Sequence, residues 1–234
     1  VENYHVPSFS LLDLQAGRRG DDLASVLGKT GLFAITGLSG DFSEIRNSAL
    51  EGLCSCSQSA EFLDIDGSDG ATLDDGVTTR TTLATATMSS IPLPLPSEHL
   101  MSLCGLETTE ALDDIRDHVA FASGVFVSAL DRLINGASSA STAENHALLR
   151  DTQGGKFTSI SSIVGVSSNL EHFHVYSKDK EKKDQLSGPE DIDSALRMHT
   201  DAGLFLSFVP ARPCGNEENK GQNSSFFVSV SGKT

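Results

Sequence analysis

The chain has 234 residues, of which 38% are hydrophobic and 21% are charged, and this composition is typical of a soluble globular protein. Its net charge of −15 repels nucleic-acid phosphate and anionic membranes, so we expect neither as a partner. No stretch approaches about 18 consecutive apolar residues, which argues against a membrane span.

The N-terminal quarter of the chain alternates between strand-like and helix-like patterns. Apolar residues recur at two-residue spacing in some segments and at three- and four-residue spacing in others. Asp21 or Asp22 is the expected N-cap of the first helix. The expected elements are a strand over 6–14, a helix over 21–29, a buried strand over 32–36 and a helix over 42–54.

The next part of the chain is expected to contain a loop, a strand and a connector. The segment 64–76 is rich in Asp and Gly and is expected to be a loop. Calcium binding there is not favoured, because an EF-hand loop needs Gly at its sixth position, where Asp69 stands. The Thr-rich segment 77–88 predicts a strand. Every second residue of the segment 91–96 is proline. This pattern predicts an extended connector or, alternatively, a polyproline ligand for a partner.

The clearest helix is predicted over 108–133, where apolar residues recur at three- and four-residue spacing and Asn135-Gly136 gives an end signal. His118 lies next to the apolar stripe, so we expect it to be packed or at the surface. The pattern then changes to strands. These are expected over 157–166, 170–176, 204–209 and 226–230, with polar loops over 177–194 and 212–225.

The four cysteines do not follow the spacing of a zinc site. Cys54 and Cys56 form C-x-C rather than C-x-x-C, and Cys104 and Cys214 stand alone. We therefore expect reduced thiols. No signal peptide is recognisable after Val1, so the expected location is the cytoplasm.

His199 and Asp201 stand two residues apart at the start of an apolar run. On an extended segment, residues i and i+2 project from the same face, so one imidazole nitrogen and one carboxylate oxygen can meet the same ion. Non-haem Fe(II) oxygenases use two histidines and one carboxylate on one face of the metal and leave the opposite face open. The pair is therefore a candidate part of an iron site.

Two blocks of the sequence resemble the iron- and 2-oxoglutarate-dependent dioxygenases of the isopenicillin N synthase-like group. The order and separation of the blocks agree with that family, and the helix over 108–133 falls where its members carry a long helix before the barrel. The residues concerned are His199-Thr200-Asp201 with the apolar stretch 202–206 and, at the front, Val6-Pro7, Asp13-Leu14, the helical segment 23–27 and the Gly-aromatic strand 31–37.

This resemblance implies an α+β fold that is mainly an antiparallel double-stranded β-helix (jelly roll), with N-terminal α/β elements, a long supporting helix and an incomplete barrel. Residues 1–157 would form the N-terminal region and 158–234 the first part of the jelly-roll oxygenase core, within one structural unit. The implied activity is oxidation of a small-molecule substrate at a C–H bond, with Fe(2+) held by His199 and Asp201 and with 2-oxoglutarate as co-substrate. Tyr176 matches a tyrosine that the family carries near the co-substrate.

The sequence departs from the family after the H-x-D motif. The second His ligand, and the Arg-x-Ser that binds the far carboxylate of the co-substrate, belong several strands later. Neither a His nor an Arg-x-Ser follows Asp201, and the only later Arg is Arg212. We therefore expect an N-terminal fragment of such an enzyme or a version without activity.

Two other interpretations stay open. His172 and His174 share one face of the strand predicted over 170–176 and could be cupin-like metal ligands, although packed or surface histidines are the simpler expectation. The chain could also be a catalytically inactive jelly-roll module that binds a partner without iron. The sequence indicates neither the substrate nor the oligomeric state.

Overall fold

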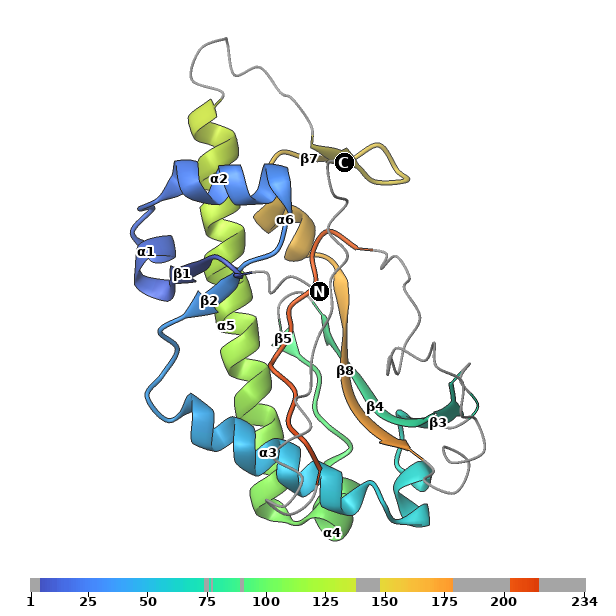
Figure 1. The fold of residues 1–234 in the computed structure, drawn as a ribbon. Coiled ribbons are helices and arrows are strands. Elements are labelled where there is room, and N and C mark those ends of the chain that lie inside the picture. The colour runs from blue at the N-terminus through green and yellow to red at the C-terminus, as the bar shows by residue number, and fades with distance from the viewer. Residues whose placement is uncertain are drawn as a thin grey trace.

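The computed structural model describes residues 5–73, 76, 78–88, 91–137, 148–178 and 203–214. Within these residues the protein is a mixed α+β structure with antiparallel sheets and no closed barrel. Figure 1 shows most of the helices on one side of the main sheet, with one long helix between the N-terminal elements and the sheet.

The N-terminal elements form a parallel pair of strands joined by two helices. Phe9, Leu14 and Leu23 are almost completely buried between these elements and the long helix. Burial of an apolar side chain of this size stabilises a fold by about 1.5–3 kcal/mol relative to exposure. The elements are β1 (Ser8–Ser10), α1 (Leu11–Gln15), α2 (Gly20–Lys29) and β2 (Ala34–Thr36), packed on the long helix α5 (Leu106–Ala137).

The beginnings of the first two helices correct the sequence prediction. The expected strand over 6–14 is wrong beyond Ser10, because the Ser10 hydroxyl accepts a hydrogen bond from a backbone amide of the next turn at 3.0 Å and caps α1. The N-cap of α2 is Arg19. Asp21 and Asp22 lie instead in its first turn, where the helix dipole favours acidic side chains.

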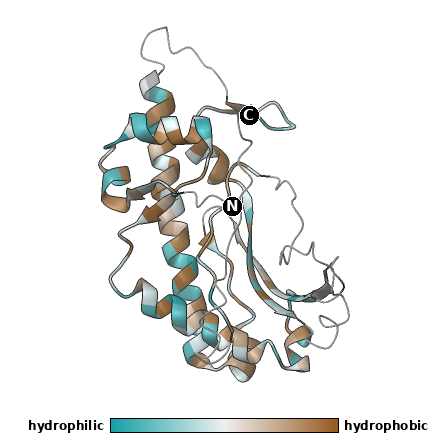
Figure 2. Cartoon of the chain, in the orientation of Figure 1, coloured by the Kyte–Doolittle hydropathy of each residue, from teal (hydrophilic) through white to brown (hydrophobic). Residues whose placement is uncertain are grey.

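The long helix α5 confirms the helix predicted over 108–133 and serves both apolar cores. Leu112 belongs to the core beneath the main sheet, and Phe126 belongs to the core beneath the N-terminal elements. By length and composition alone, residues 106–136 could also cross a membrane. In the structure the helix packs against other helices and carries both apolar and polar residues along its length (Figure 2).

The main sheet is built around β4 (Thr78–Met88), which confirms the strand predicted over 77–88. The loop expected over 64–76 is wrong over Ser68–Thr72, because these residues form β3 and pair with β4 along their whole length. β4 and β8 come from the expected regions 1–157 and 158–234, and their 11-residue pairing joins both regions in one sheet. The partners of β4 are β3 (Ser68–Thr72), β5 (Ile91–Pro92) and β8 (Ser168–Lys178), all antiparallel.

Successive residues of β4 and β8 point to opposite faces of the sheet. The inner face carries Leu83, Phe173 and Val175, which share one core with the helices on that side. On the outer face, the β8 residues from Ser168 to Tyr176 are exposed, and Leu170 is 75% exposed. The helices on the inner side are α3 (Phe42–Cys56), η1 (Ala60–Asp64), α4 (Ser97–Cys104) and α5.

A short hairpin and a helix precede β8, namely β6 (Leu149–Arg150), β7 (Lys156–Phe157) and α6 (Ile160–Val164). The strand predicted over 157–166 is therefore wrong where α6 forms. Asp131 of α5 accepts hydrogen bonds from the amides of Ile160 at 2.6 Å and Ser161 at 3.1 Å. These bonds satisfy amides at the start of α6. The Ile and Val residues of α6 are β-branched and do not by themselves favour a helix.

The two strands predicted nearest the C-terminus have different outcomes. The segment 203–214 is described and contains no strand, so the strand expected over 204–209 is wrong as a paired element. The strand expected over 226–230 lies outside the described residues.

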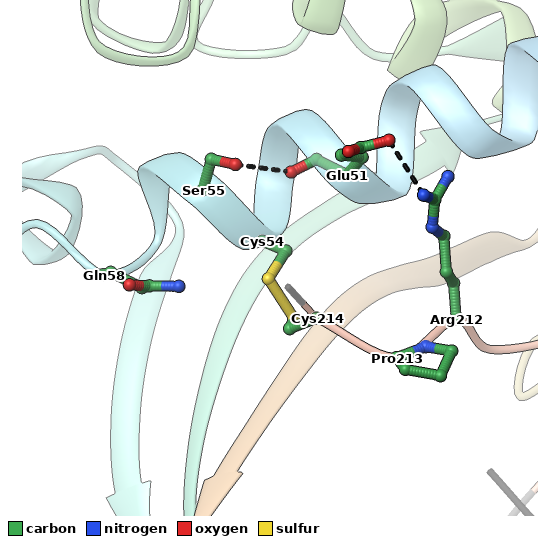
Figure 3. Close-up of a pocket in the computed structure, with 7 residues that line it drawn as sticks. All are labelled: Glu51, Cys54, Ser55, Gln58, Arg212, Pro213 and Cys214. Atoms are coloured by element: carbon green, nitrogen blue, oxygen red, sulfur yellow. Dashed lines mark hydrogen bonds and ion pairs between the residues drawn. A yellow bond between two sulfur atoms is a disulfide. The ribbon is translucent and has the colours of Figure 1, made fainter. Parts of the chain in front are cut away.

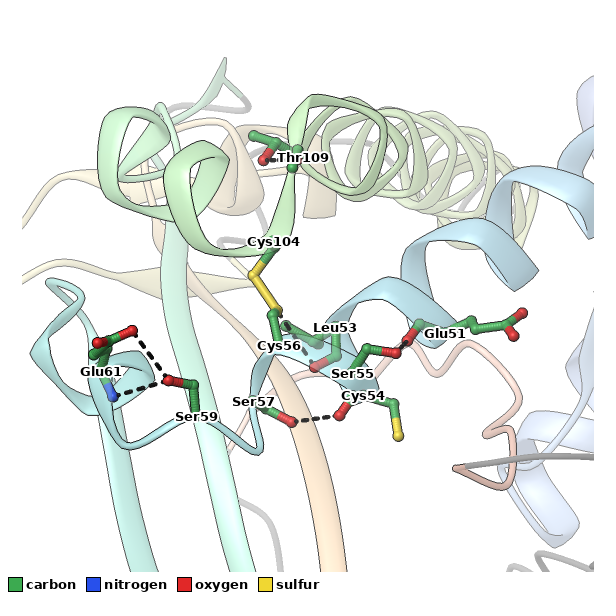
Figure 4. Close-up of a disulfide and its surroundings, with 11 residues drawn as sticks. Glu51, Leu53, Cys54, Ser55, Cys56, Ser57, Ser59, Glu61, Cys104 and Thr109 are labelled. Atoms are coloured by element: carbon green, nitrogen blue, oxygen red, sulfur yellow. Dashed lines mark hydrogen bonds between the residues drawn. A yellow bond between two sulfur atoms is a disulfide. The ribbon is translucent and has the colours of Figure 1, made fainter.

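All four cysteines form disulfides, so the expectation of reduced thiols is wrong. Cys56 at the end of α3 is bonded to Cys104 at the end of α4, with their Cα atoms 5.1 Å apart (Figure 4). Cys54 is bonded to Cys214 with a Cα–Cα distance of 5.7 Å. This second disulfide ties the segment 203–214, which we call the strap, to α3.

Candidate functional site

The predicted site residues divide between the described and the undescribed parts of the chain. His199 and Asp201, the expected iron ligands, lie outside the described residues. Tyr176 lies on β8 and is 40% exposed. His172 and His174 precede it at two-residue intervals and therefore share its face of the sheet. The predicted Tyr position and the two histidines thus meet on the outer face.

β4 supplies the other half of this surface. Arg80 lies directly opposite Tyr176, and Thr82 lies opposite His174. Directly paired residues of antiparallel strands have Cβ atoms about 5 Å apart on the same face. We call Arg80, Thr82, His172, His174 and Tyr176 the outer-face cluster.

The three ring side chains of the outer-face cluster form a ladder along β8. The ring centroids of His172 and His174 are 5.3 Å apart, and those of His174 and Tyr176 are 5.9 Å apart. Nδ1 of His174 lies 2.9 Å from Oγ1 of Thr82, whose side chain is buried. This hydrogen bond holds the His174 ring against the sheet by its Nδ1 edge.

The protonation state of His174 follows from these surroundings. Desolvation against the sheet lowers its pKa most, and the positive charge of Arg80 and then that of His172 lower it further, to about 4. His174 is therefore neutral at neutral pH. A neutral imidazole offers one donor and one lone pair, which can accept a hydrogen bond or hold a metal.

Arg80 is the cation of the outer-face cluster. Its Nε atom is buried and has no hydrogen-bond partner among the described residues. In the part of the chain that the structure describes, no carboxylate forms an ion pair with its guanidinium. Arg80 is not among the site residues predicted from the sequence, although strict alternation along 78–88 places it on the same face as Thr82.

The inner face holds a second polar group, which is fully paired. Nε of Arg116 donates to Glu171 at 2.8 Å, and Nη1 donates to Asp113 at 2.8 Å. Nη2 donates to the carbonyl of Leu93 at 2.6 Å. The Arg116 side chain is only 3% exposed. Because its donors are used within the protein, Arg116 joins α5 to β8 and is not available to a ligand.

The strap borders a small cavity of about 110 Å³ beside its disulfide (Figure 3). Arg46 of α3 donates to two strap carbonyls at 2.8 Å each, and Arg212 pairs with Glu51 at 2.9 Å. The cavity has room for only a few water molecules, and its one cation is already paired. It is therefore a weaker candidate for ligand binding than the outer-face cluster.

Among the described residues, no group of three or more His, Cys, Asp or Glu side chains is placed to hold a metal ion. The outer-face cluster combines imidazole, phenol, hydroxyl and guanidinium groups, which can bind an anion or orient a small polar molecule. No family model matches the chain, and no curated protein or solved structure matches it. The function is therefore inferred from the chain's own residues.

Proposed function

We propose that the protein is a non-haem Fe(II)- and 2-oxoglutarate-dependent oxygenase that oxidises a C–H bond of a small molecule. The observation that carries the proposal is the position of Tyr176 beside two histidines on one face of β8, the strand that precedes His199-Thr200-Asp201 in the sequence. In the group that the sequence resembles, the strand before H-x-D carries a tyrosine near the co-substrate.

The donor chemistry of the H-T-D motif fits Fe(II). His199 would give an imidazole nitrogen and Asp201 a carboxylate oxygen, the two ligand types that non-haem iron oxygenases use. Bound iron would supply the activation of dioxygen, which protein side chains do not perform. The third ligand is not assigned to a residue, since no His follows Asp201 in the sequence.

The described residues would position the reactants. The bond to Thr82 holds the His174 ring in one orientation, and Tyr176 presents its hydroxyl next to that ring. The buried ion pair of Arg116 with Glu171 anchors β8 on α5, so the outer face is supported by a rigid helix. Rigid support of this kind keeps binding groups in a productive geometry.

We also propose that the main sheet is part of a jelly roll whose interior lies on the outer-face side. In support, β3, β4, β5 and β8 form one antiparallel sheet, and the core helices pack on its inner face. A sheet that is covered by helices on one side has its other side available for a second sheet.

Anaerobic equilibrium dialysis against Fe(II) tests the iron site. We expect about one iron per wild-type chain, and loss of that iron in His199→Ala and in Asp201→Ala. His99→Ala is the matched control, because His99 is an exposed histidine on α4 and its removal should leave iron binding unchanged. Equal iron binding by all four proteins would contradict the proposal.

A second candidate function is that of a binding module without iron. The strap favours it, because Leu204, Leu206 and Phe208 alternate along an extended segment and are 63%, 55% and 59% exposed. Apolar side chains on an extended segment suit pairing with a partner strand. Absence of iron binding in the wild-type protein would favour this function over the oxygenase.

The expected location and partners stay predictions. The cytoplasmic expectation rested partly on reduced thiols, but all four cysteines are paired, and disulfides are rare in cytosolic proteins. The cysteines therefore no longer support that location. A small-molecule substrate without nucleic acid remains the proposal, because the net charge of −15 disfavours a polyanion.

A further inference from the structure

A groove along one face of α5 is separate from both the outer-face cluster and the strap. It has a volume of about 490 Å³ and borders α1, which packs on α5 (Figure 1). The α5 residues that line it, apart from Val125, follow one another at three- or four-residue intervals, so the groove follows a single helix face. Its lining residues are Gln15 of α1 and Phe121, Gly124, Val125, Ser128 and Arg132 of α5.

The groove contains both a projecting apolar ring and a hollow. Phe121 is 54% exposed, although phenylalanine is one of the residues most often found buried. One turn further along α5, a Cβ added at Gly124 would meet no atom of the described residues within 4 Å. A glycine on a helix face lets another helix approach closely. The same face therefore offers a ring that needs cover and a position that can receive a ring.

The charge of this helix face changes along its length. Glu110 and Asp114 are exposed on the N-terminal side of Phe121, and Arg132 is exposed on the C-terminal side. Two parallel copies of the face would place acid beside acid, which disfavours that direction. In an antiparallel pair, Phe121 of each copy lies opposite Gly124 of the other. The same register brings Arg132 of each copy beside Asp114 of the other, as charge complementarity requires.

We propose that α5 binds the α5 of a second copy of this chain as an antiparallel pair, with each Phe121 ring seated at Gly124 of the other copy. A two-fold interface uses the same surface on both copies, so a face that carries both the ring and the hollow can bind itself. One helix pair gives a small interface, and each copy carries a charge of −15, so the dimer is weak. This inference concerns assembly and does not depend on the oxygenase proposal.

Sedimentation velocity of the full chain tests the dimer. We expect wild type to dimerise as its concentration rises from about 1 µM to about 1 mM, a range suited to a small interface. Phe121→Ser should weaken the dimer by about tenfold or more, because the buried rings are lost. Leu63→Ser is the matched control, since Leu63 on η1 is 52% exposed and lies outside the groove.

Two results of this experiment would overturn the proposal. Wild type that stays monomeric over the whole range would show that a second copy does not fill the groove, and would leave it to a partner protein. A dimer that Phe121→Ser leaves intact would place the interface on another surface. Because Phe121 is largely exposed, its replacement removes little of the folded core.

A charge reversal separates the proposed contact from the net charge. Asp114→Arg makes each copy less acidic but places an arginine beside Arg132 of the other copy, so it should weaken the dimer. Asp64→Arg changes the net charge equally at an exposed position on η1, and should not weaken it. Equal effects of the two substitutions would contradict the proposed register.

Spin labels measure the direction of the pair. All four native cysteines form disulfides, so Glu110→Cys introduces a thiol that a nitroxide reagent can label. In the dimer of the labelled protein, an antiparallel pair separates the two labels by about 40 Å, whereas a parallel pair brings them within about 10–20 Å. Pulsed electron paramagnetic resonance distinguishes these distances, and the shorter one would overturn the antiparallel pairing.

Discussion

Nδ1 of His174 lies 2.9 Å from the hydroxyl oxygen of Thr82, across the pairing of β4 with β8. The surroundings of the His174 ring make stability depend on pH. Desolvation and the charge of Arg80 lower the folded-state pKa of His174 to about 4, below the ordinary value of 6.5. Between these values the unfolded chain binds more protons than the folded one. The stability associated with neutral His174 is therefore fully present above about pH 6.5 and is lost as the pH falls toward 4.

Urea unfolding at several pH values between about 7.5 and 4 measures this dependence. His174→Asn removes the titrating group but keeps a side chain that can bond Thr82, so the variant should lose less stability than wild type as the pH falls. His99→Asn removes an exposed histidine and should follow the wild-type curve. Parallel curves for His174→Asn and wild type would show that His174 does not titrate in this window.

Among the charged residues of the described structure, we expect Arg116 to contribute most to the free energy of unfolding. Arg116→Met leaves Glu171 in a largely enclosed site without its cation, which should lower the free energy of unfolding by about 3 kcal/mol. Arg18→Met is the matched control. Arg18 pairs with Asp13 at the surface, where such pairs contribute about 1 kcal/mol or less. Similar losses for the two variants in chemical denaturation would contradict the structural role of the buried pair.

Two glycines in helices should respond with opposite sign to alanine. A Cβ on Gly52 of α3 would lie 2.8 Å from Cβ and 2.6 Å from Cγ2 of Thr108 on α5, so Gly52→Ala should destabilise by about 1–3 kcal/mol. A Cβ on Gly124 of α5 would meet no atom within 4 Å. Gly124→Ala should therefore stabilise by about 0.5–1 kcal/mol. Thermal unfolding of both variants checks the contrast, and a shift in the same direction for both would rule out the close packing of α3 on α5.

The two disulfides should differ in their rates of reduction. Cys214 is exposed, whereas Cys56 is buried, and thiolate attack needs access to a sulfur atom. Timed reduction by a dithiol, followed by alkylation and peptide mapping, should label Cys54 and Cys214 before Cys56 and Cys104. Opening of the first disulfide should also speed amide hydrogen exchange in the strap while α5 stays protected. Simultaneous labelling of all four cysteines would contradict this order.

The sequence predicted the elements whose patterns are local. The helices over 21–29, 42–54 and 108–133 were found because their apolar residues recur with helical spacing, and this pattern survives in the folded cores. The β-prone stretch 77–88 was found because it is long and lacks turn residues. The α+β class, which the family resemblance implied, is the class of the described structure.

Two of the elements that the sequence missed depend on distant contacts, whereas α1 begins at a local cap on Ser10. α6 begins where Asp131, on another helix, accepts hydrogen bonds from its first amides, and β3 forms because Gly70 and its neighbours pair with β4. The Cys54–Cys214 disulfide joins residues 160 positions apart. For the candidate site, alternation could have revealed that Arg80 shares a face with the β8 rings, but the burial of its Nε atom required the structure.

The most direct test of the oxygenase proposal is the absorption spectrum of the anaerobic protein with Fe(II), recorded before and after addition of 2-oxoglutarate. We expect a weak new visible band on addition of 2-oxoglutarate to wild type, and no band in the double variant of His199→Ala and Asp201→Ala. A wild-type spectrum that does not change, or a double variant that gives the same band, would contradict it.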